Sequence, residues 1–387
     1  MTHSVRVNRH GADRISAGHV WIFSSDVINR GEAPAGEAVR VLDPKGRTLG
    51  AAHYSSASQI CLRMLSSRPE AIGGPFLEAR LAAAAAHRER VVSDTDAYRV
   101  VHAEGDLLPA LIVDRYGDYL SVQTLDQGMD RARHWVIASL IKLLAPKGIV
   151  LRNDAAVREK EELPLETSIV HGEVPPRVAL RMNGLQFFAD LMGGQKTGTY
   201  LDQRENYFAA RRYARGNALD CFTSSGGFAL HLASQCDSVE AIDSSASAIA
   251  SANENKAANA IENVEFREAD VFELLAGHVN ARRQFATIVL DPPAFTKSRG
   301  SVEAALRGYK EINLRALRLL APGGTLITCS CSHHISESML AETLAAASLD
   351  AGRRLRVLER RTQAQDHPIL LTVPETHYLK CFIVQSV

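Results

Sequence analysis

Residues 220–231 read Asp-Cys-Phe-Thr-Ser-Ser-Gly-Gly-Phe-Ala-Leu-His and decide the fold of the chain. The apolar run 218–222 enters a Ser/Gly turn, which opens directly into a helical pattern from Gly227. Glycines let a backbone approach a ligand closely, and the start of a helix supplies free N–H groups. This strand, turn and helix predict a site for a nucleotide-like ligand. The residues expected to border it are Asp220, Phe222, Thr223, Gly226 and Gly227.

A second acidic residue, Asp243, ends the next apolar run, 239–242, about one βα unit further along the chain. An acid at that position can accept hydrogen bonds from both hydroxyl groups of a ribose. A dehydrogenase would show the same turn and the same acid. The two features alone therefore predict a nucleotide site without choosing between enzyme classes.

Two further apolar runs end in residues that can carry chemistry. Residues 285–290 run into Asp291-Pro292-Pro293, and residues 323–328 run into Cys329-Ser330-Cys331-Ser332. From residue 216 onward, strand and helix patterns alternate, which predicts an α/β fold with a doubly wound, Rossmann-like parallel sheet buried between helices. Ligands bind beyond the carboxyl ends of such strands, where these residues fall.

The combination of motifs identifies a resemblance. Residues 220–227, Asp243, Asp270 and 291–293 resemble motifs of class I S-adenosylmethionine-dependent methyltransferases. The whole chain is similar to the ribosomal RNA large-subunit methyltransferase I family, whose enzymes make 5-methylcytosine. A dehydrogenase is disfavoured, because a dinucleotide requires a G-x-G-x-x-G turn for its pyrophosphate and residues 223–228 lack that spacing.

The resemblance implies S-adenosylmethionine as the cofactor. Asp243 would hold its ribose and Asp270 the adenine amino group, with Asp291 and Pro292 also beside it. In the family, the stretch before the catalytic domain borders the cofactor pocket, so Gln203 is expected to face it. Lys196 and Thr197 are weighed as further contacts, against the alternative of a solvated linker.

Carbon-5 of cytosine is a poor nucleophile, so an enzyme that methylates it must first add a thiolate to C6. Residues 291–293 also resemble the Asp-Pro-Pro motif of enzymes that methylate an exocyclic amino group. In those enzymes an aromatic residue follows the motif, whereas Ala294 follows it here. Many RNA cytosine-C5 enzymes carry a second cysteine at that position to release the product. In this chain, water, Asp291 or a further, unidentified residue is left for that step.

Either Cys329 or Cys331 can be the nucleophile, because an extended strand points both to the same face. In RNA cytosine-C5 methyltransferases, a Gly-Gly pair is followed by six residues and then by Cys-Ser, and residues 323–332 resemble this pattern. Counted from Gly323-Gly324, that spacing reaches Cys331. Cys331 is therefore the predicted nucleophile, Cys329 is the alternative, and Asp291 would hold the base. Lys297 or Arg299 would favour the thiolate or contact RNA phosphates.

Composition and turn-forming residues such as the Gly-Gly-Pro run at 73–75 predict three domains. They are a small β-barrel at 1–72, a mixed α/β domain at 73–190 and the methyltransferase domain at 191–387. The first range has nine Lys and Arg against six Asp and Glu, and the second has 14 against 17. The basic first range is therefore expected to contact RNA through Arg6, Arg9 and Arg14. The resemblance implies that its barrel is of the PUA type; a dimerisation barrel is the alternative.

The remaining features set broad limits. No run of about 18 apolar residues and no secretory signal is present, so a cytoplasmic protein without a membrane partner is expected. The six cysteines are scattered, and the spacing of the Cys and His residues at 329–334 does not fit a zinc site. The expected partner is ribosomal RNA or a pre-ribosomal particle, and a homodimer is left open. The rival functions are an amino-group RNA or protein methyltransferase and a non-catalytic ribosome-assembly protein.

Overall fold

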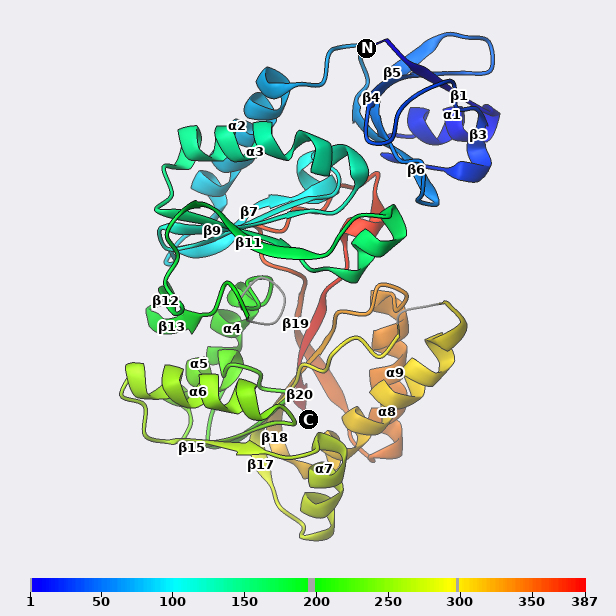
Figure 1. Cartoon of the computed structure of the whole chain (residues 1–387). Helices are drawn as coiled ribbons and strands as arrows, with labels where there is room; N and C mark the ends of the chain where they lie inside the picture. The colour runs from blue at the N-terminus through cyan, green and yellow to red at the C-terminus, as the bar shows by residue number, and fades with distance from the viewer. Residues whose placement is uncertain (1, 194–198, 297–298) are drawn as a thin grey trace. The chain divides into compact units, whose positions relative to one another are not determined.

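The computed structural model describes residues 2–193, 199–296 and 299–387. Contacts between residues divide the chain into two compact units. The first unit comprises Met1–Arg181, Ala189–Thr199 and Gln365–Thr376, and the second comprises Met182–Phe188, Tyr200–Ala364 and His377–Val387. Figure 1 follows the elements of both along the chain.

The first unit begins with a six-stranded sheet of strand order β2-β6-β5-β4-β1-β3. Its elements are β1 (Ser4–Val7), α1 (Arg9–Ser16), β2 (Trp21–Phe23), β3 (Val27–Asn29), β4 (Ala38–Leu42), β5 (Thr48–Tyr54) and β6 (Ile60–Ser66). Val5 and Val7 are buried while Arg6 between them is exposed, because successive strand residues face opposite sides of a sheet. The short β-like runs 5–7, 20–23, 38–42 and 60–63 of the sequence predict β1, β2, β4 and β6, whereas α1, β3 and β5 were not predicted.

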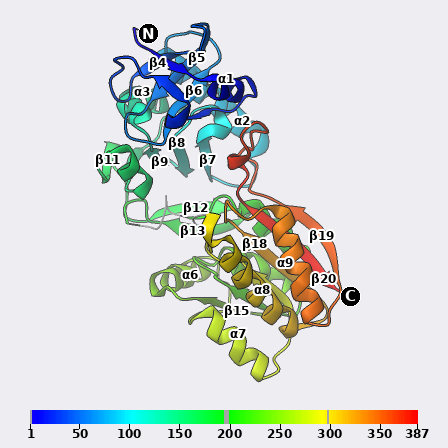
Figure 2. The same ribbon diagram turned by 90° about the vertical axis from the view of Figure 1, so that its right-hand side faces the viewer.

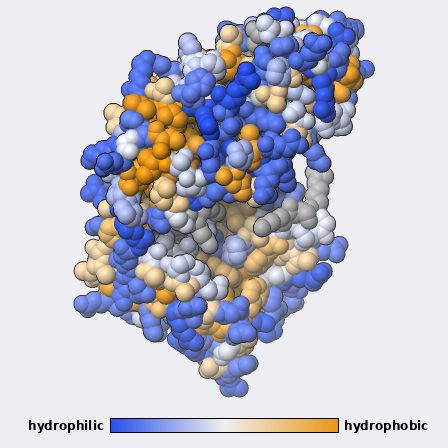
Figure 3. Space-filling view, viewed as in Figure 1, coloured by the Kyte–Doolittle hydropathy of each residue, from blue (hydrophilic) through white to orange (hydrophobic). Residues whose placement is uncertain are grey.

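A second sheet in this unit has the strand order β11-β10-β9-β8-β7. Its elements are α2 (Gly74–Val91), β7 (Ala97–His102), β8 (Leu111–Tyr116), β9 (Tyr119–Thr124), α3 (Gln127–Leu144), β10 (Gly148–Asn153) and β11 (Glu166–Gly172). Helices α2 and α3 lie side by side over the sheet (Figure 1). Figure 3 shows an apolar patch on the surface. Among the exposed large apolar side chains are Trp135 of α3 and Ile169 and Val170 of the edge strand β11.

Buried charges and a late segment of the chain join these two sheets. Arg63 Nη2 of β6 donates to Glu161 Oε1 at 2.7 Å, and its Nη1 lies 3.4 Å from Asp126 Oδ2. Val373, from the segment Gln365–Thr376, packs in the core of the six-stranded sheet. The barrel and the middle sheet therefore share one compact unit, and the boundaries at residues 72 and 190 stay predictions.

The second unit is built on a seven-stranded sheet of order β16-β15-β14-β17-β18-β20-β19. Its strands are β14 (Asn217–Cys221), β15 (Ser238–Asp243), β16 (Val264–Glu268), β17 (Phe285–Leu290), β18 (Leu320–Ser330), β19 (Leu355–Arg361) and β20 (Lys380–Ser386). The first five are parallel, and β20 pairs antiparallel with both β18 and β19. A separate two-stranded sheet pairs β12 (Val178–Met182) with β13 (Leu185–Ala189).

Helices cover the seven-stranded sheet (Figures 1 and 2). They are α4 (Arg204–Arg211), α5 (Gly227–Leu232), α6 (Ala246–Ala258), α7 (Val271–Asn280), α8 (Val302–Leu319) and α9 (Glu337–Asp350). Leu274 of α7, Tyr309 of α8 and Leu340 of α9 belong to one apolar core with residues of the central strands. The predicted doubly wound sheet is confirmed. The runs 355–358 and 378–384 of the sequence predict last, partly antiparallel strands, which are β19 and β20, whereas α7 was not predicted.

Candidate active site

The strand order places the candidate site at the junction of β14 and β17. From β14 the chain adds β15 and β16 on one side, and β17 and β18 are added on the other. Ligands of open α/β sheets bind at such a reversal, beyond the carboxyl ends of the strands. Asp291, which follows β17, donates its backbone N–H to Cys221 O at the end of β14 at 3.3 Å. Asp291, the acid of the predicted Asp-Pro-Pro motif, therefore lies next to the glycine turn.

The turn after β14 has an unusual backbone. Phe222 (φ 65°), Ser224 (φ 50°) and Gly226 (φ 88°) all adopt left-handed conformations, which cost little only for glycine. A Cβ on Gly226 would lie 2.8 Å from the ring of Phe266, and one on Gly227 would clash with the ring of Tyr207. The protein's own aromatic side chains therefore require these glycines, a reason that the sequence alone did not reveal.

Asp220 is buried directly beneath the turn. Its Oδ2 accepts hydrogen bonds from Thr223 Oγ1 at 2.6 Å and from Ala229 N at 3.0 Å. Burial raises the pKa of Asp220 to about 7, although both hydrogen bonds act to lower it. Its Oδ1 is buried without a hydrogen-bond partner in the described part of the chain. A donor from a ligand or a water would satisfy this oxygen, so the turn fits a bound polar group.

The other two cofactor acids lie at the ends of neighbouring strands. Asp243 ends β15, and its two carboxylate oxygens accept the backbone N–H groups of Ser224 and Ser245, both at 2.9 Å. Asp243 therefore fixes the turn through the N–H of Ser224 and lies at the carboxyl end of β15. Asp270 is exposed and caps α7, accepting the N–H of Glu273 at 2.9 Å. This capping role was missed by the sequence, although Asp before an apolar run is a helix-start signal.

A chain of buried amides reaches Asp291. Arg361 Nε donates to Asn206 Oδ1 at 2.9 Å, and Asn206 Nδ2 donates to Gln203 Oε1 at 2.7 Å. Gln203 Nε2 in turn donates to Asp291 Oδ1 at 2.9 Å. Gln203 is only 2% exposed, so its amide has one fixed orientation. The structure thus brings two of the predicted site residues, Gln203 and Asp291, into direct contact.

The cysteine near the end of β18 and the cysteine just after the strand differ in accessibility. Cys329 is fully buried; burial raises the pKa of its thiol well above the ordinary value, and the neighbouring Cys381 adds to the shift. Cys331 is half-buried, and its Sγ lies 4.0 Å from Pro292 O. Of the two, only Cys331 is open to a substrate in part, and it lies beside the loop that carries Asp291.

Phe295 does not replace the missing aromatic residue after Asp-Pro-Pro. Its ring centroid lies 4.7 Å from that of Tyr309 and 6.2 Å from that of Phe272, and it packs against the core of the second unit. Pro292 is buried, and Phe222 is half-buried against the same core. Phe295 is therefore engaged with the protein's own aromatic rings.

The predicted basic residues have different outcomes. Arg6 of β1 and Arg9, the first residue of α1, are exposed. Arg14 is half-buried, donating from Nε to Trp21 O at 2.8 Å and lying over the Phe23 ring. Lys196, Thr197 and Lys297 lie outside the described residues, as does the side chain of Arg299.

Sequence reasoning missed Lys380, a buried lysine that is the first residue of β20. A lone lysine before the apolar run 381–384 is the signal that could have found it.

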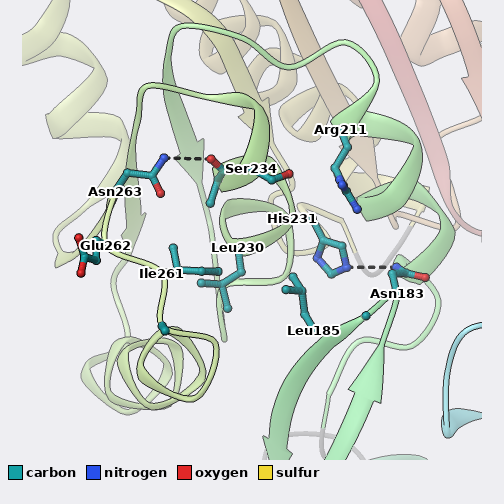
Figure 4. Close-up of a pocket in the computed structure, with 12 residues that line it drawn as sticks. Asn183, Leu185, Arg211, Leu230, His231, Ser234, Ile261, Glu262 and Asn263 are labelled. Atoms are coloured by element: carbon teal, nitrogen blue, oxygen red, sulfur yellow. Dashed lines mark hydrogen bonds between the residues drawn. The ribbon is translucent and has the colours of Figure 1, made fainter.

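A pocket of about 600 Å³ lies at the C-terminal end of α5, away from the turn (Figure 4). His231 in its wall pairs Nδ1 with Gly227 O at 2.7 Å, and Asn183 Nδ2 donates to Nε2 at 3.1 Å. Burial lowers the pKa of His231 to about 4, so this ring is a neutral structural residue. None of the predicted site residues lines this pocket.

No helix of the described ranges 2–193, 199–296 and 299–387 combines the length and apolar character of a membrane span. No cluster of three or more His, Cys, Asp or Glu side chains in these ranges is arranged to hold a metal ion.

Comparison with known sequence families defines the class. Residues 5–67 match a PUA-like domain and residues 214–370 match a methyltransferase domain. The class is therefore a methyltransferase with a Rossmann-like catalytic sheet and an N-terminal PUA-like domain, as predicted. S-adenosylmethionine is its cofactor, which agrees with the partnerless Asp220 oxygen at the turn.

Relatives of known name specify the family. The chain is 41% identical over 379 residues to ribosomal RNA large subunit methyltransferase I of Tolumonas auensis, covering 95% of this chain and 96% of the relative. It is 40% identical to the protein of that name from Shewanella amazonensis, covering 95% of each. The chain belongs to the ribosomal RNA large subunit methyltransferase I family.

Solved structures agree on the fold. A crystal structure of a putative methyltransferase complexed with SAH superposes with a TM-score of 0.86 at 17% identity, covering 99% of this chain and 100% of the other. A putative S-adenosylmethionine-dependent methyltransferase from Streptococcus mutans gives 0.84 at 17% identity with the same coverage. At this identity, the likeness supports the architecture only.

Proposed function

We propose that the protein transfers a methyl group from S-adenosylmethionine to C5 of a cytosine in large-subunit ribosomal RNA, through a covalent adduct of Cys331 at C6. The relatives at about 40% identity carry the name of a ribosomal RNA large subunit methyltransferase. The cytosine and the adduct rest on one observation of this chain: Cys331 is half-buried beside the Asp291 loop, at the carboxyl edge of the sheet. The reaction is proposed to take place in the cytoplasm, and a homodimer stays an open alternative.

The cofactor would be held by the turn and the strand-end acids, and it supplies an electrophilic methyl group when bound. Asp243 would accept the ribose hydroxyl groups, and Asp270 would contact the adenine. Asp220 Oδ1 offers a buried acceptor at the turn. These positions all fall at the ends of β14, β15 and β16, where the fold predicts a ligand.

The protein's own groups would act on the cytosine in sequence. The Cys331 sulfur forms a bond to C6, and the C5–C6 electron pair moves to C5, which becomes the nucleophile. Asp291, held by Gln203, would accept a hydrogen bond from the N4 amino group. The negative charge that the thiolate brings to the ring is balanced by a proton that N3 takes from water and returns when the sulfur departs. After methylation, the proton on C5 leaves to a base, the C5–C6 double bond reforms and the sulfur departs as thiolate.

Two observations disfavour methylation of an exocyclic amino group. Ala294 follows Asp-Pro-Pro, and the nearby Phe295 packs on Tyr309 and Phe272. No aromatic side chain of residues 291–296 is therefore left to stack on a target base beside Asp291.

Any target base must leave its stack in the RNA to reach a strand end, which costs a few kcal/mol unless the RNA is single-stranded there.

Nucleoside analysis tests the proposal. The purified protein is incubated with S-adenosylmethionine and unmodified large-subunit ribosomal RNA, or the assembled subunit, and the digested RNA is examined by mass spectrometry. We expect 5-methylcytosine with the wild type and with the control Cys236→Ala, which changes a buried cysteine in the segment between α5 and β15. We expect none with Cys331→Ala.

Other products would point to the rivals. A methylated amino group would favour the amino methyltransferase. Cofactor and RNA binding without any methylation would favour a non-catalytic assembly protein. Ribosomal RNA from a deletion strain provides the matching test in cells, because the proposed product must then disappear.

A further inference from the structure

Lys380 occupies an exceptional position for a lysine. It is the first residue of β20 and is only 3% exposed. The antiparallel register places it opposite Ser330, the residue before Cys331. Its Nζ donates to Ser332 O at 2.7 Å and to Tyr378 O at 2.9 Å. Lys380 is therefore fixed by the backbone on the C-terminal side of Cys331.

Ionisable groups from two neighbouring elements face Cys331. Lys380 of β20 bonds to Ser332 O, and Tyr309 of α8 bonds to the hydroxyl groups of Ser330 and Ser332, so both lie beside Cys331 and interact with its charge. The Tyr309 hydroxyl is 2.9 Å from Ser330 Oγ and 3.0 Å from Ser332 Oγ. Pro292 contributes a carbonyl from the Asp291 loop, and the neighbouring His333 pairs its ring with Tyr378 at 5.6 Å. Lys380 supplies the buried positive charge of this group.

A buried ammonium costs free energy unless a negative charge or acceptors compensate it. Burial lowers the pKa of Lys380 to about 8, and the negative charge of Cys331 opposes that shift. Coupling between two titrating groups is mutual, so the ammonium must stabilise the thiolate as much as the thiolate stabilises the ammonium. At neutral pH most Lys380 side chains still carry the proton.

We propose that Lys380 is a positioning residue that holds Cys331 as a thiolate, ready to attack C6 of the substrate base. This inference deepens the proposed function and rests on it, since it names the group that activates its nucleophile. The Cys331 proton leaves to solvent, while Lys380 keeps its own proton and its bonds to the two carbonyl groups. A cation from the loop 297–299 is then not required for ionisation.

Alkylation of the thiol tests this pairing without RNA or cofactor. Iodoacetamide reacts with the thiolate, so the rate at each pH reports how much Cys331 is ionised. Of the six cysteines, Cys331 alone is not buried, so peptide mass spectrometry can follow it in the full-length protein. We expect a wild-type midpoint at least one pH unit below the ordinary thiol value of about 8.5.

Three variants separate charge from structure. Lys380→Gln keeps a donor for the carbonyl groups but removes the charge, and should raise the midpoint by at least one pH unit. Lys380→Arg keeps the charge and should stay near the wild type. Tyr309→Phe removes the hydroxyl and should move the midpoint by much less. The control Lys310→Gln changes an exposed lysine that pairs with Asp350 on the surface, and should leave the midpoint unchanged.

The outcomes are decisive for this inference and separate from the proposed function. A wild-type midpoint at or above 8.5 overturns the inference even if the Lys380 variants fail to fold. An unchanged midpoint in folded Lys380→Gln overturns it as well. If the midpoint shifts as expected but no 5-methylcytosine forms, the proposed function fails while the Lys380–Cys331 coupling stands.

Discussion

Gln203 Nε2 donates a hydrogen bond of 2.9 Å to Asp291 Oδ1, and Gln203 is itself held by Asn206 at 2.7 Å. Gln203 immediately precedes α4. The bond therefore links the segment that leads into the catalytic domain with the strand end at which the target base is proposed to bind. The carboxylate of Asp291 therefore has a defined orientation. An oriented acceptor matters for catalysis, because small misplacements of a catalytic group reduce the rate strongly.

Gln203→Leu should lower kcat by about ten- to a hundredfold, because Asp291 loses its orienting donor. The Kd for S-adenosylmethionine should change by less than about threefold, which calorimetric titration can measure. Gln385→Leu, at the opposite end of the sheet where Gln385 contacts Gly323 O, is the matched control. A tenfold rise in Kd with kcat unchanged would instead support the predicted direct contact of Gln203 with the cofactor.

Asp243→Ala should weaken S-adenosylmethionine binding at least tenfold, since the carboxylate is proposed to hold the ribose and also accepts the N–H of Ser224. Asp243→Asn keeps the size and one acceptor of the side chain, so it separates the ribose contact from collapse of the turn. Asp237→Ala changes an exposed acid just before β15 and should bind like the wild type. Tighter binding of NAD than of S-adenosylmethionine would contradict the assignment of the site.

The pKa of Asp220, raised to about 7 by burial, predicts a pH-dependent stability. The folded state binds this proton more tightly than the unfolded state does, so the stabilisation is complete below the unfolded pKa and is lost as pH rises through 7. Between pH 5.5 and 8 the loss from this one group should be about 2 kcal/mol. Urea denaturation of wild type and Asp220→Asn at both pH values should show a smaller loss in the variant. Equal losses would place Asp220 in a solvated environment.

The strand ends were predictable because short apolar runs that end in an acid mark buried parallel strands. Asp243 and Asp291 were found in this way, and Asp220 was found through the glycine turn that follows its run. The reason for Gly226 and Gly227 was not predictable, because Phe266 and Tyr207 reach them from distant parts of the sequence. Lys380 was missed for a similar reason, since only the pairing of β18 with β20 brings it to Cys331.

The basic N-terminal range is proposed to bind RNA through the exposed Arg6 of β1 and Arg9 of α1. Deleting residues 1–72 would also expose Val373 and leave Asp126 and Glu161 without Arg63, so charge reversal is the cleaner test. Arg6→Glu with Arg9→Glu should weaken RNA binding and reduce its salt slope by roughly 0.7 to 0.9 for each phosphate that the protein no longer neutralises. Cofactor affinity should stay unchanged.

Lys142→Glu is the control for that experiment, since Lys142 is an exposed cation of α3 that pairs with Glu78. Electrophoretic or fluorescence titration at several salt concentrations gives both affinity and slope. If the double arginine reversal binds RNA with the wild-type slope, the first sheet does not contact the phosphates, and the dimerisation alternative gains support.

RNA that contains 5-fluorocytosine tests which cysteine forms the adduct. Fluorine at C5 cannot be removed as a proton, so the bond between sulfur and C6 should persist and a protein–RNA complex should survive denaturing electrophoresis. We expect the complex with wild type and with Cys329→Ala, because Cys329 is fully buried between Cys381 and Gln203. We expect none with Cys331→Ala, whose half-buried thiol is the one beside the Asp291 loop. The reverse pattern would move the nucleophile to Cys329. Methylation of ordinary RNA without any adduct on the fluorinated substrate would argue against covalent catalysis.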